Sequence, residues 1–185
     1  MLSKTESLLL WSSSLWGLGL GMFGPLYAIF AREVGGDILE LTWVYAAYLF
    51  VMGVGVIYVG KMGDSIGHER LLVFGRVLGT IATFGYLFVG SIMSLFVVQV
   101  AIGIATAFSE PSWFALYDKH SGDGGSDGYV WGLSAGLWYM AQGLGLVIGG
   151  YIVAWYSFDA LFVTMGTVVA ISTVYQMRIL KHVTT

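Results

Sequence analysis

Apolar residues run along this chain in long stretches separated by short polar segments. The hydrocarbon core of a bilayer is about 30 Å thick, so a helix that crosses it needs roughly 20 consecutive, mostly apolar residues. Stretches of that length predict an all-α membrane protein with six transmembrane helices, which form one domain over residues 1–185. The predicted spans are 8–31, 41–60, 71–92, 95–117, 129–155 and 160–177.

The composition agrees with a membrane protein. Of the 185 residues 57% are hydrophobic and 10% are charged, and the mean hydropathy is +0.82. A soluble domain carries about 25% charged residues, so we expect the partner of this surface to be the lipid bilayer. A net charge of −3 with no basic cluster excludes a nucleic-acid partner. Because the chain has no cysteine, disulfides and thiol chemistry are excluded as well.

The positions of lysine and arginine predict the orientation in the membrane. If the spans alternate in direction, only Arg32 falls on one side, and the other cations share the opposite side. These are Lys4, Lys61, Arg70, Arg76, Lys119, Arg178 and Lys181. The positive-inside rule then places both termini in the cytoplasm. The predicted location is a bacterial or archaeal cell membrane.

Two connections are informative. The link at Met93–Ser94 predicts a tight outer hairpin between the third and fourth spans. Residues 118–128 are rich in glycine, serine and aspartate and predict a cytoplasmic linker, because a calcium loop would need a closing bidentate glutamate.

Proline placement suggests an internal repeat. Pro25 and Pro111 stand at corresponding positions in the first and fourth spans, and glycine pairs correspond in the second and fifth spans. This pattern predicts a three-plus-three inverted repeat with both helices interrupted at proline, as in many transporters. The alternative is coincidence in a sequence dominated by glycine, leucine and valine.

The segment from Gly60 to Arg70 reads Gly-Lys-Met-Gly-Asp-Ser-Ile-Gly-His-Glu-Arg. It resembles the signature loop between the second and third spans of major facilitator superfamily transporters, although Ser65 and Glu69 replace two cations of that loop. The matching residues are Gly60, Asp64, Gly67, His68 and Arg70. Members of that family have twelve spans in two halves around a central cavity, so the chain resembles one half.

The resemblance implies a function. It implies a secondary transporter that moves a small solute by alternating access, with a second copy of the chain, or another six-helix half, as the missing wall. It also implies that Asp64 caps a helix of the opposite half and so latches the cytoplasmic gate of a dimer. Arg70 and Arg76 are then its local counter-charges. The alternative is that Asp64 is a solvated turn residue that caps the start of its own third helix. Proton coupling is less expected, because Gln99 stands where the family often carries an arginine.

A polar stripe marks the fourth span. Side chains spaced by three and four residues share one helix face, so the stripe is expected to face a cavity. Its members are Gln99, Gly103, Thr106, Glu110, Trp113 and Tyr117. Glu110 is the candidate to bind a proton or a cationic solute, because charges inside a bilayer are costly. The alternative is a structural partner of Lys119, Lys61 or Arg70.

Aromatic and amide side chains in two other spans complete the candidate site. Tyr45 and Tyr48 come from the second span, and Trp138 and Gln142 from the fifth. Together they suit an amphipathic or weakly polar organic solute, whereas ordinary membrane packing is the alternative for each aromatic residue taken singly. Small-residue pairs elsewhere, among them Gly128–Gly132–Gly136 in the fifth span, are expected at close helix contacts or at a dimer seam.

No enzyme is expected. The pattern Gly132-Leu-Ser134-Ala-Gly136 resembles a serine-hydrolase motif, but it opens a membrane helix and has no histidine within reach. The sequence shows no phosphate loop, metal cluster or nucleotide fingerprint, so no cofactor is expected. Two further possibilities stay open, namely a non-transporting scaffold or accessory subunit of the same fold, and a piece of a longer protein.

Overall fold

The computed structural model describes residues 3–120 and 127–182, and all regular structure in these residues is helical. Five helices are long and apolar enough to cross a membrane, or six if α1 and α2 form one span bent by 45°. The all-α membrane fold expected from the sequence is therefore confirmed. The elements are α1 (Lys4–Gly21), α2 (Leu26–Glu33), α3 (Ile38–Ile66), α4 (His68–Gly85), η1 (Tyr86–Phe88), α5 (Ile92–His120), α6 (Asp127–Trp155), α7 (Phe158–Gln176) and η2 (Met177–His182).

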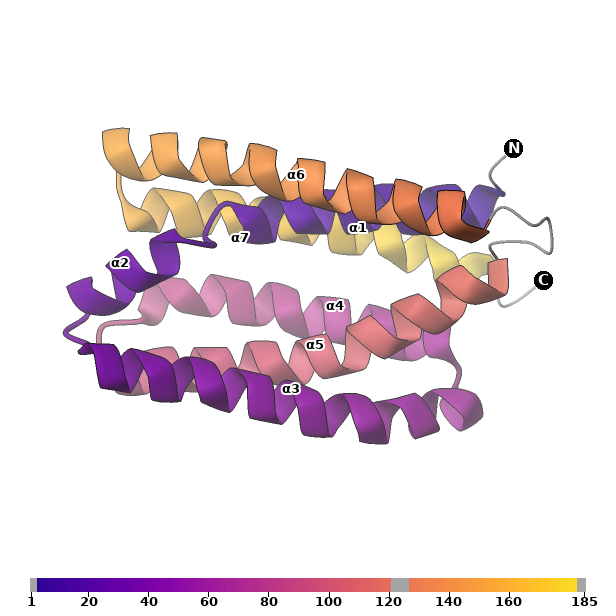
Figure 1. Cartoon of the computed structure of the whole chain (residues 1–185), viewed down its shortest axis with the longest axis horizontal. Helices are drawn as coiled ribbons and strands as arrows, with labels where there is room; N and C mark the ends of the chain where they lie inside the picture. The colour runs from indigo at the N-terminus through magenta and orange to yellow at the C-terminus, as the bar shows by residue number, and fades with distance from the viewer. Residues whose placement is uncertain (1–2, 121–126, 183–185) are drawn as a thin grey trace.

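The helices lie side by side along the long axis of the molecule (Figure 1). The start of α1 and the end of η2 lie at the same end of the bundle as the α3–α4 turn, which we call the inner end. The opposite end, with the α2–α3 and α6–α7 turns, is the outer end. This alternation agrees with the predicted order of spans, and the cytoplasmic placement of the inner end stays a prediction.

Polar residues just before the apolar runs set the helix starts. Ser3 and Glu6 form a capping box at α1, and Asp37 and Glu40 form another at α3. At α7 the Ser157 hydroxyl accepts a hydrogen bond from the backbone N–H of Ala160 at 3.2 Å. Such caps satisfy the free N–H groups of a first helical turn, so these short polar segments specify the helix starts.

The helices differ from the predicted spans at two connections. Helix α3 continues past Gly60 to Ile66, and the turn consists of Gly67, whose φ of 98° suits glycine. The outer link lies at residues 89–91 and not at Met93–Ser94, which belong to the first turn of α5. The first error arises because apolar length marks the edge of a bilayer and α3 continues beyond it. The second arises because the apolar run continues past the end of η1 at Phe88 and hides the link. Most of the predicted linker, residues 121–126, lies outside the described residues.

The two prolines behave differently. Pro25 lies at the break between α1 and α2, so the first span is interrupted there. Pro111 lies inside α5, which runs uninterrupted from Ile92 to His120 and changes direction along its length (Figure 1). The predicted interruption at Pro111 is therefore wrong. A proline removes one N–H group and crowds the preceding turn, and a long helix packed on its neighbours accommodates this by bending.

Two hydrophobic clusters hold the bundle. The outer cluster contains a set of packed aromatic rings around Phe23, including Phe30, Tyr86 and Phe162. The inner cluster is built around leucines such as Leu9 of α1. By contrast, only 11% of the apolar window of α3 and 17% of that of α6 is buried within the chain, against 44% for the α4 span. Helices α3 and α6 form the two edges of the molecule (Figure 1).

Candidate solute cavity between the helix groups

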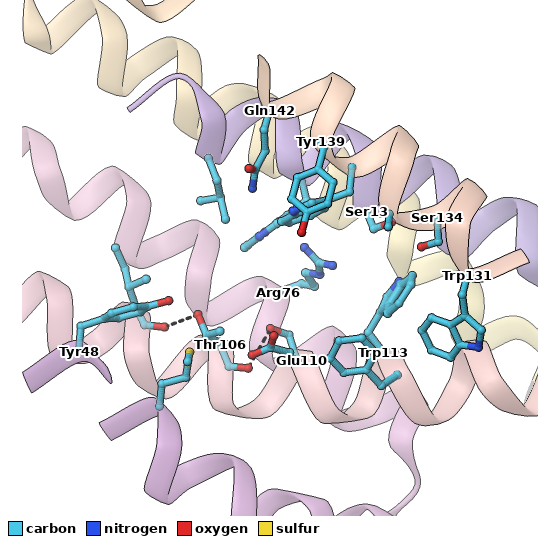
Figure 2. Close-up of a pocket in the computed structure, with 18 residues that line it drawn as sticks. Ser13, Tyr48, Arg76, Thr106, Glu110, Trp113, Trp131, Ser134, Tyr139 and Gln142 are labelled. Atoms are coloured by element: carbon cyan, nitrogen blue, oxygen red, sulfur yellow. Dashed lines mark hydrogen bonds between the residues drawn. The ribbon is translucent and has the colours of Figure 1, made fainter. Parts of the chain in front are cut away.

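A cavity of about 580 Å³ lies between α1 and α6 on one side and α3 and α5 on the other (Figure 2). Seven of its 18 lining residues are aromatic and seven are polar or charged, and the polar ones come from α1, α4, α5 and α6. The aromatic wall residues are Trp16, Tyr48, Trp113, Phe114, Trp131, Trp138 and Tyr139. The polar residues are Ser13, Arg76, Thr106, Ser109, Glu110, Ser134 and Gln142. A concave site with aromatic walls and a few convergent polar groups is typical of small-molecule binding.

Arg76 is placed differently from the prediction. The sequence suggested a cation at the cytoplasmic boundary beside Asp64, whereas the structure places Arg76 within α4, 5% exposed and facing the cavity. Its guanidinium carbon lies 4.3 Å from the centre of the Trp16 ring. Glycines flank it, since Gly75 packs on α5 and Gly79 packs on Trp16. These close approaches draw the middle of α4 into the bundle and bury the arginine.

The second charged residue of the cavity is Glu110 of α5. Its side chain is exposed, and Figure 2 shows it on the same cavity as Arg76 and Thr106. Among the described residues no ion pair within 4 Å joins Glu110 to Arg76, so these two side chains are not in direct contact. For the same reason the structure gives no support to Glu110 as a structural partner of a loop cation.

The structure brings together most of the predicted solute residues. Tyr48, Thr106, Glu110, Trp138 and Gln142 all line the cavity, although they come from three different helices. Their convergence follows from helix geometry, because residues three or four apart on each helix share a face.

Two predicted solute residues do not line the cavity. Gln99 is buried at 5% exposure in the outer half of α5, and Tyr45 packs its ring against Tyr27 and Tyr48. Both lie at the level where the bent first span covers the cavity, so the polar stripe continues beyond the space that it lines. At that level α5 packs directly on α3, where Gly103 contacts the backbone of Tyr48.

Helix α1 supplies residues that the sequence analysis missed. Ser13 and Trp16 line the cavity. The adjacent Ser12 donates a hydrogen bond to the side chain of Gln176 at the end of α7. Three consecutive serines, Ser12 to Ser14, interrupt an otherwise apolar span. That run is the signal that could have identified the polar side of α1.

The signature loop lies at the inner end. Asp64 is 83% exposed and lies 3.6 Å from the His68 ring, and Arg70 is exposed on the first turn of α4. Gly60 has open space around it, whereas Gly67 forms the turn. Asp64 lies in the last turns of α3 and not at the start of α4, so it does not cap its own third helix.

Aromatic rings close the cavity towards the inner end. Trp113 stacks on Tyr117 at 4.8 Å, and Tyr117 contacts Trp131 at 5.1 Å between ring centres. The Tyr117 hydroxyl also donates a 2.8 Å hydrogen bond to the carbonyl oxygen of Val130. These contacts join α5 to α6 across the two helix groups.

Helices of bilayer length around a polar and aromatic cavity define a helical membrane protein. The sequence profile of the Major Facilitator Superfamily matches residues 9–183, nearly the whole chain. The chain therefore belongs to this superfamily of membrane transporters, which confirms the resemblance seen in the sequence.

Several curated relatives are similar to it. An uncharacterized MFS-type transporter of Methanocaldococcus jannaschii is 30% identical over 51% of the chain and 24% of its own length. Multidrug resistance protein MdtG of Dickeya zeae is 26% identical over 88% of the chain and 40% of its own length. The tetracenomycin C resistance and export protein of Streptomyces glaucescens is 24% identical over 71% of the chain and 24% of its own length. The chain thus spans less than half the length of these relatives.

Proposed function

We propose that the chain forms one half of a secondary transporter, which moves a small organic solute by alternating access as a homodimer. The observation that carries the proposal is the incomplete cavity. Its aromatic and charged walls come from the two helix groups of one chain, and the apolar windows of the bordering helices α3 and α6 are only 11% and 17% buried. Polar groups inside a bilayer are costly unless protein or water surrounds them. A second six-helix unit supplies the missing wall.

The glycines of the edge helices support a protein partner. A Cβ atom added at Gly53 or Gly60 of α3 would meet no atom within 4 Å. The same holds along α6 at Gly128, Gly132, Gly136, Gly143 and Gly150. Stripes of small residues allow membrane helices to approach closely, and the sequence analysis already placed part of this stripe at a possible dimer seam. In the proposed dimer, α3 of one copy packs on α6 of the other.

The relatives and the cavity support an organic solute. Relatives named for multidrug resistance and for tetracenomycin C export match most of the chain. The aromatic walls suit the same broad class of solute. In the proposed cycle the two six-helix units rock about the cavity. Within each unit the proline-containing helices, α1–α2 and α5, take equivalent positions in the proposed inverted repeat.

Asp64 is the proposed inner latch. Its carboxylate lies beside His68 at the end of α3 and is 83% exposed. In the proposed dimer it binds the N-terminus of α6 in the partner copy, where the helix dipole favours an anion. We expect Asp64→Asn to shift the balance between inward-open and outward-open states, measured by the accessibility of the cavity from each side. Unchanged accessibility and unchanged transport would show that Asp64 is a solvated turn residue.

Cross-linking tests the dimer, and the absence of native cysteine leaves no background reaction. Leu49 lies three residues before the cavity residue Met52, so it is on the same side of α3. Leu146 lies four residues after the cavity residue Gln142, so it is on the same side of α6. The two leucines are 45% and 37% exposed. Because α3 and α6 run in opposite directions, they lie at similar depths. We expect Leu49→Cys with Leu146→Cys to form a disulfide-linked dimer in native membranes.

The matched control lies on the opposite faces of the same helices. Phe50 lies two residues before Met52, and Leu144 two residues after Gln142, so both point away from the cavity, and both are exposed. Phe50→Cys with Leu144→Cys should give no dimer. Equal cross-linking of the two pairs would mean random collision, and cross-linking of the control pair alone would place the seam on the outer faces.

Accessibility tests alternating access. Ser134→Cys places one thiol on the cavity wall, and Leu144→Cys places one on the outer face of the same helix. In vesicles of known orientation, we expect a membrane-impermeant thiol reagent to label the Ser134→Cys variant from either side and to spare the Leu144→Cys variant. Labelling of Ser134→Cys from one side alone, with no solute flux, would favour the scaffold or accessory-subunit interpretation.

A further inference from the structure

Arg76 is a buried cation without an acidic partner among the described residues. Its side chain is 5% exposed, and among the described residues its Nε has no hydrogen-bond acceptor. The contact that positions the guanidinium is the face of Trp16 at 4.3 Å. An arginine inside a bilayer is normally paired or marks the path of a solute. Arg76 faces the cavity, so its free donors are presented to whatever occupies that space.

Glu110 places the opposite charge on the same cavity. It reaches the space from α5, while Arg76 reaches it from α4, and no ion pair within 4 Å joins them in the described parts of the chain. Arg76 and Glu110 are the charged side chains of this cavity. Figure 2 shows both below Tyr139 of α6, with Glu110 next to Thr106.

The geometry points to a zwitterionic solute with an aromatic or apolar body, whose anionic group binds Arg76 and whose cationic group binds Glu110. A guanidinium presents a planar fork of donors that matches a carboxylate, sulfonate or phosphonate. The tryptophan and tyrosine walls provide the surface for the body of the solute. This inference rests on the proposed transport function and specifies its substrate class.

Charge balance decides among the possible solutes. With both side chains ionised the cavity is neutral, so a zwitterion satisfies both and leaves no excess charge in a region of low dielectric. A simple cation would leave Arg76 unpaired beside an added positive charge. A simple anion would leave Glu110 unpaired beside an added negative charge. Both arrangements are costly at membrane depth.

Three probes with the same ring separate these cases. Phenylalanine carries both charges, 3-phenylpropionate lacks the ammonium group, and phenethylamine lacks the carboxylate. Their dissociation constants are measured by calorimetry on the full chain in lipid nanodiscs. We expect the wild-type chain to bind phenylalanine more tightly than either singly charged probe, by at least about tenfold, because a buried charge left unpaired is strongly unfavourable.

The variants assign each charge. Arg76→Gln should weaken phenylalanine binding at least about tenfold and leave phenethylamine binding unchanged or tighter. Glu110→Gln should weaken phenylalanine binding and strengthen 3-phenylpropionate binding. Arg76→Lys keeps the charge without the fork, so it should retain the order of the probes with lower affinity. Together these results would define the substrate class by its two charged groups.

Other results would overturn the inference. Equal loss of all three probes in Arg76→Gln would make Arg76 a structural residue, and tightest wild-type binding of phenethylamine or 3-phenylpropionate would contradict the zwitterion. Failure of all three probes to bind also counts against it. If Arg76→Gln does not fold, Glu110→Gln decides, because its preference must move towards 3-phenylpropionate. Charge-specific binding without flux in vesicles would reject the transport function alone, and flux without charge-specific binding would reject this inference alone.

Discussion

The two faces of α6 carry the same residue type in opposite surroundings. Towards α1, Gly145 and Gly149 touch backbone, and an added Cβ would collide with carbonyl oxygens of Leu18 and Met22. Away from α1, glycines such as Gly143 face open space. The first set holds the chain together, whereas the second leaves room for something outside it. What lies opposite a glycine therefore decides whether it serves the fold or an interface.

The largest effect is expected at the closed face. Gly145→Ala forces a methyl group against the Leu18 carbonyl, and overpacking of this kind costs about 1–3 kcal/mol. Gly143→Ala, two residues away on the open face, is the control and should leave the unfolding temperature of the detergent-purified monomer unchanged. Equal unfolding temperatures for the two variants would contradict the close packing of α1 and α6.

The open face should show its effect on association. Gly143→Leu places a bulky side chain where the proposed partner packs, and we expect at least about a tenfold rise in the dimer dissociation constant, about 1.4 kcal/mol. Particle mass in nanodiscs, corrected for lipid, measures it. Leu144→Phe, on the exposed outer face of α6, is the control. A strict monomer in the wild-type chain would remove the dimer from the proposal.

A smaller effect is expected at the seam between α1 and α7. The Ser172 hydroxyl donates a 2.7 Å hydrogen bond to the Ser12 carbonyl and is buried. Interhelical hydrogen bonds in membranes contribute about 0.6 kcal/mol on average, so Ser172→Ala should lower the unfolding free energy by about that amount. Thr167→Val removes a hydroxyl that bonds within its own helix on the exposed side, and it should cost less. The reverse order would show that the seam contributes nothing.

The smallest effect is expected on the outer face of α3. Phe50 is 73% exposed, so Phe50→Leu should change neither stability nor dimer mass by more than about 0.5 kcal/mol. Thermal unfolding and particle mass check this in one preparation. A clear loss of dimer in Phe50→Leu would move the seam from the cavity side of α3 to its outer face.

The sequence was sufficient for the fold because apolar length is a physical requirement of the bilayer. It was also sufficient for much of the cavity, since Thr106, Glu110 and Gln142 follow from helical spacing. It failed for Arg76, because counting along the chain placed this residue near the boundary, while its burial depends on close packing at Gly75 and Gly79. Such approaches between distant segments are tertiary, and one sequence does not display them.

The failures at Gln99 and Tyr45 have the same origin. The spacing of a polar stripe predicts which face of the helix its side chains share. It does not predict where along the helix the cavity ends and neighbouring helices come into contact. In the structure the outer half of α5 packs on α3, so Gln99 is buried. The repeat likewise suggested equal roles for Pro25 and Pro111, whereas only the former coincides with a break.

The link between α3 and α4 consists of Gly67 alone. One residue reaches at most about 3.6 Å, so the inner tips of these two helices are tethered and cannot separate. At the outer end three residues, 89–91, join η1 to α5, so this link allows a larger separation than Gly67 does. Any opening between α3 and α4 must therefore occur towards the outer end, with Gly67 as its hinge.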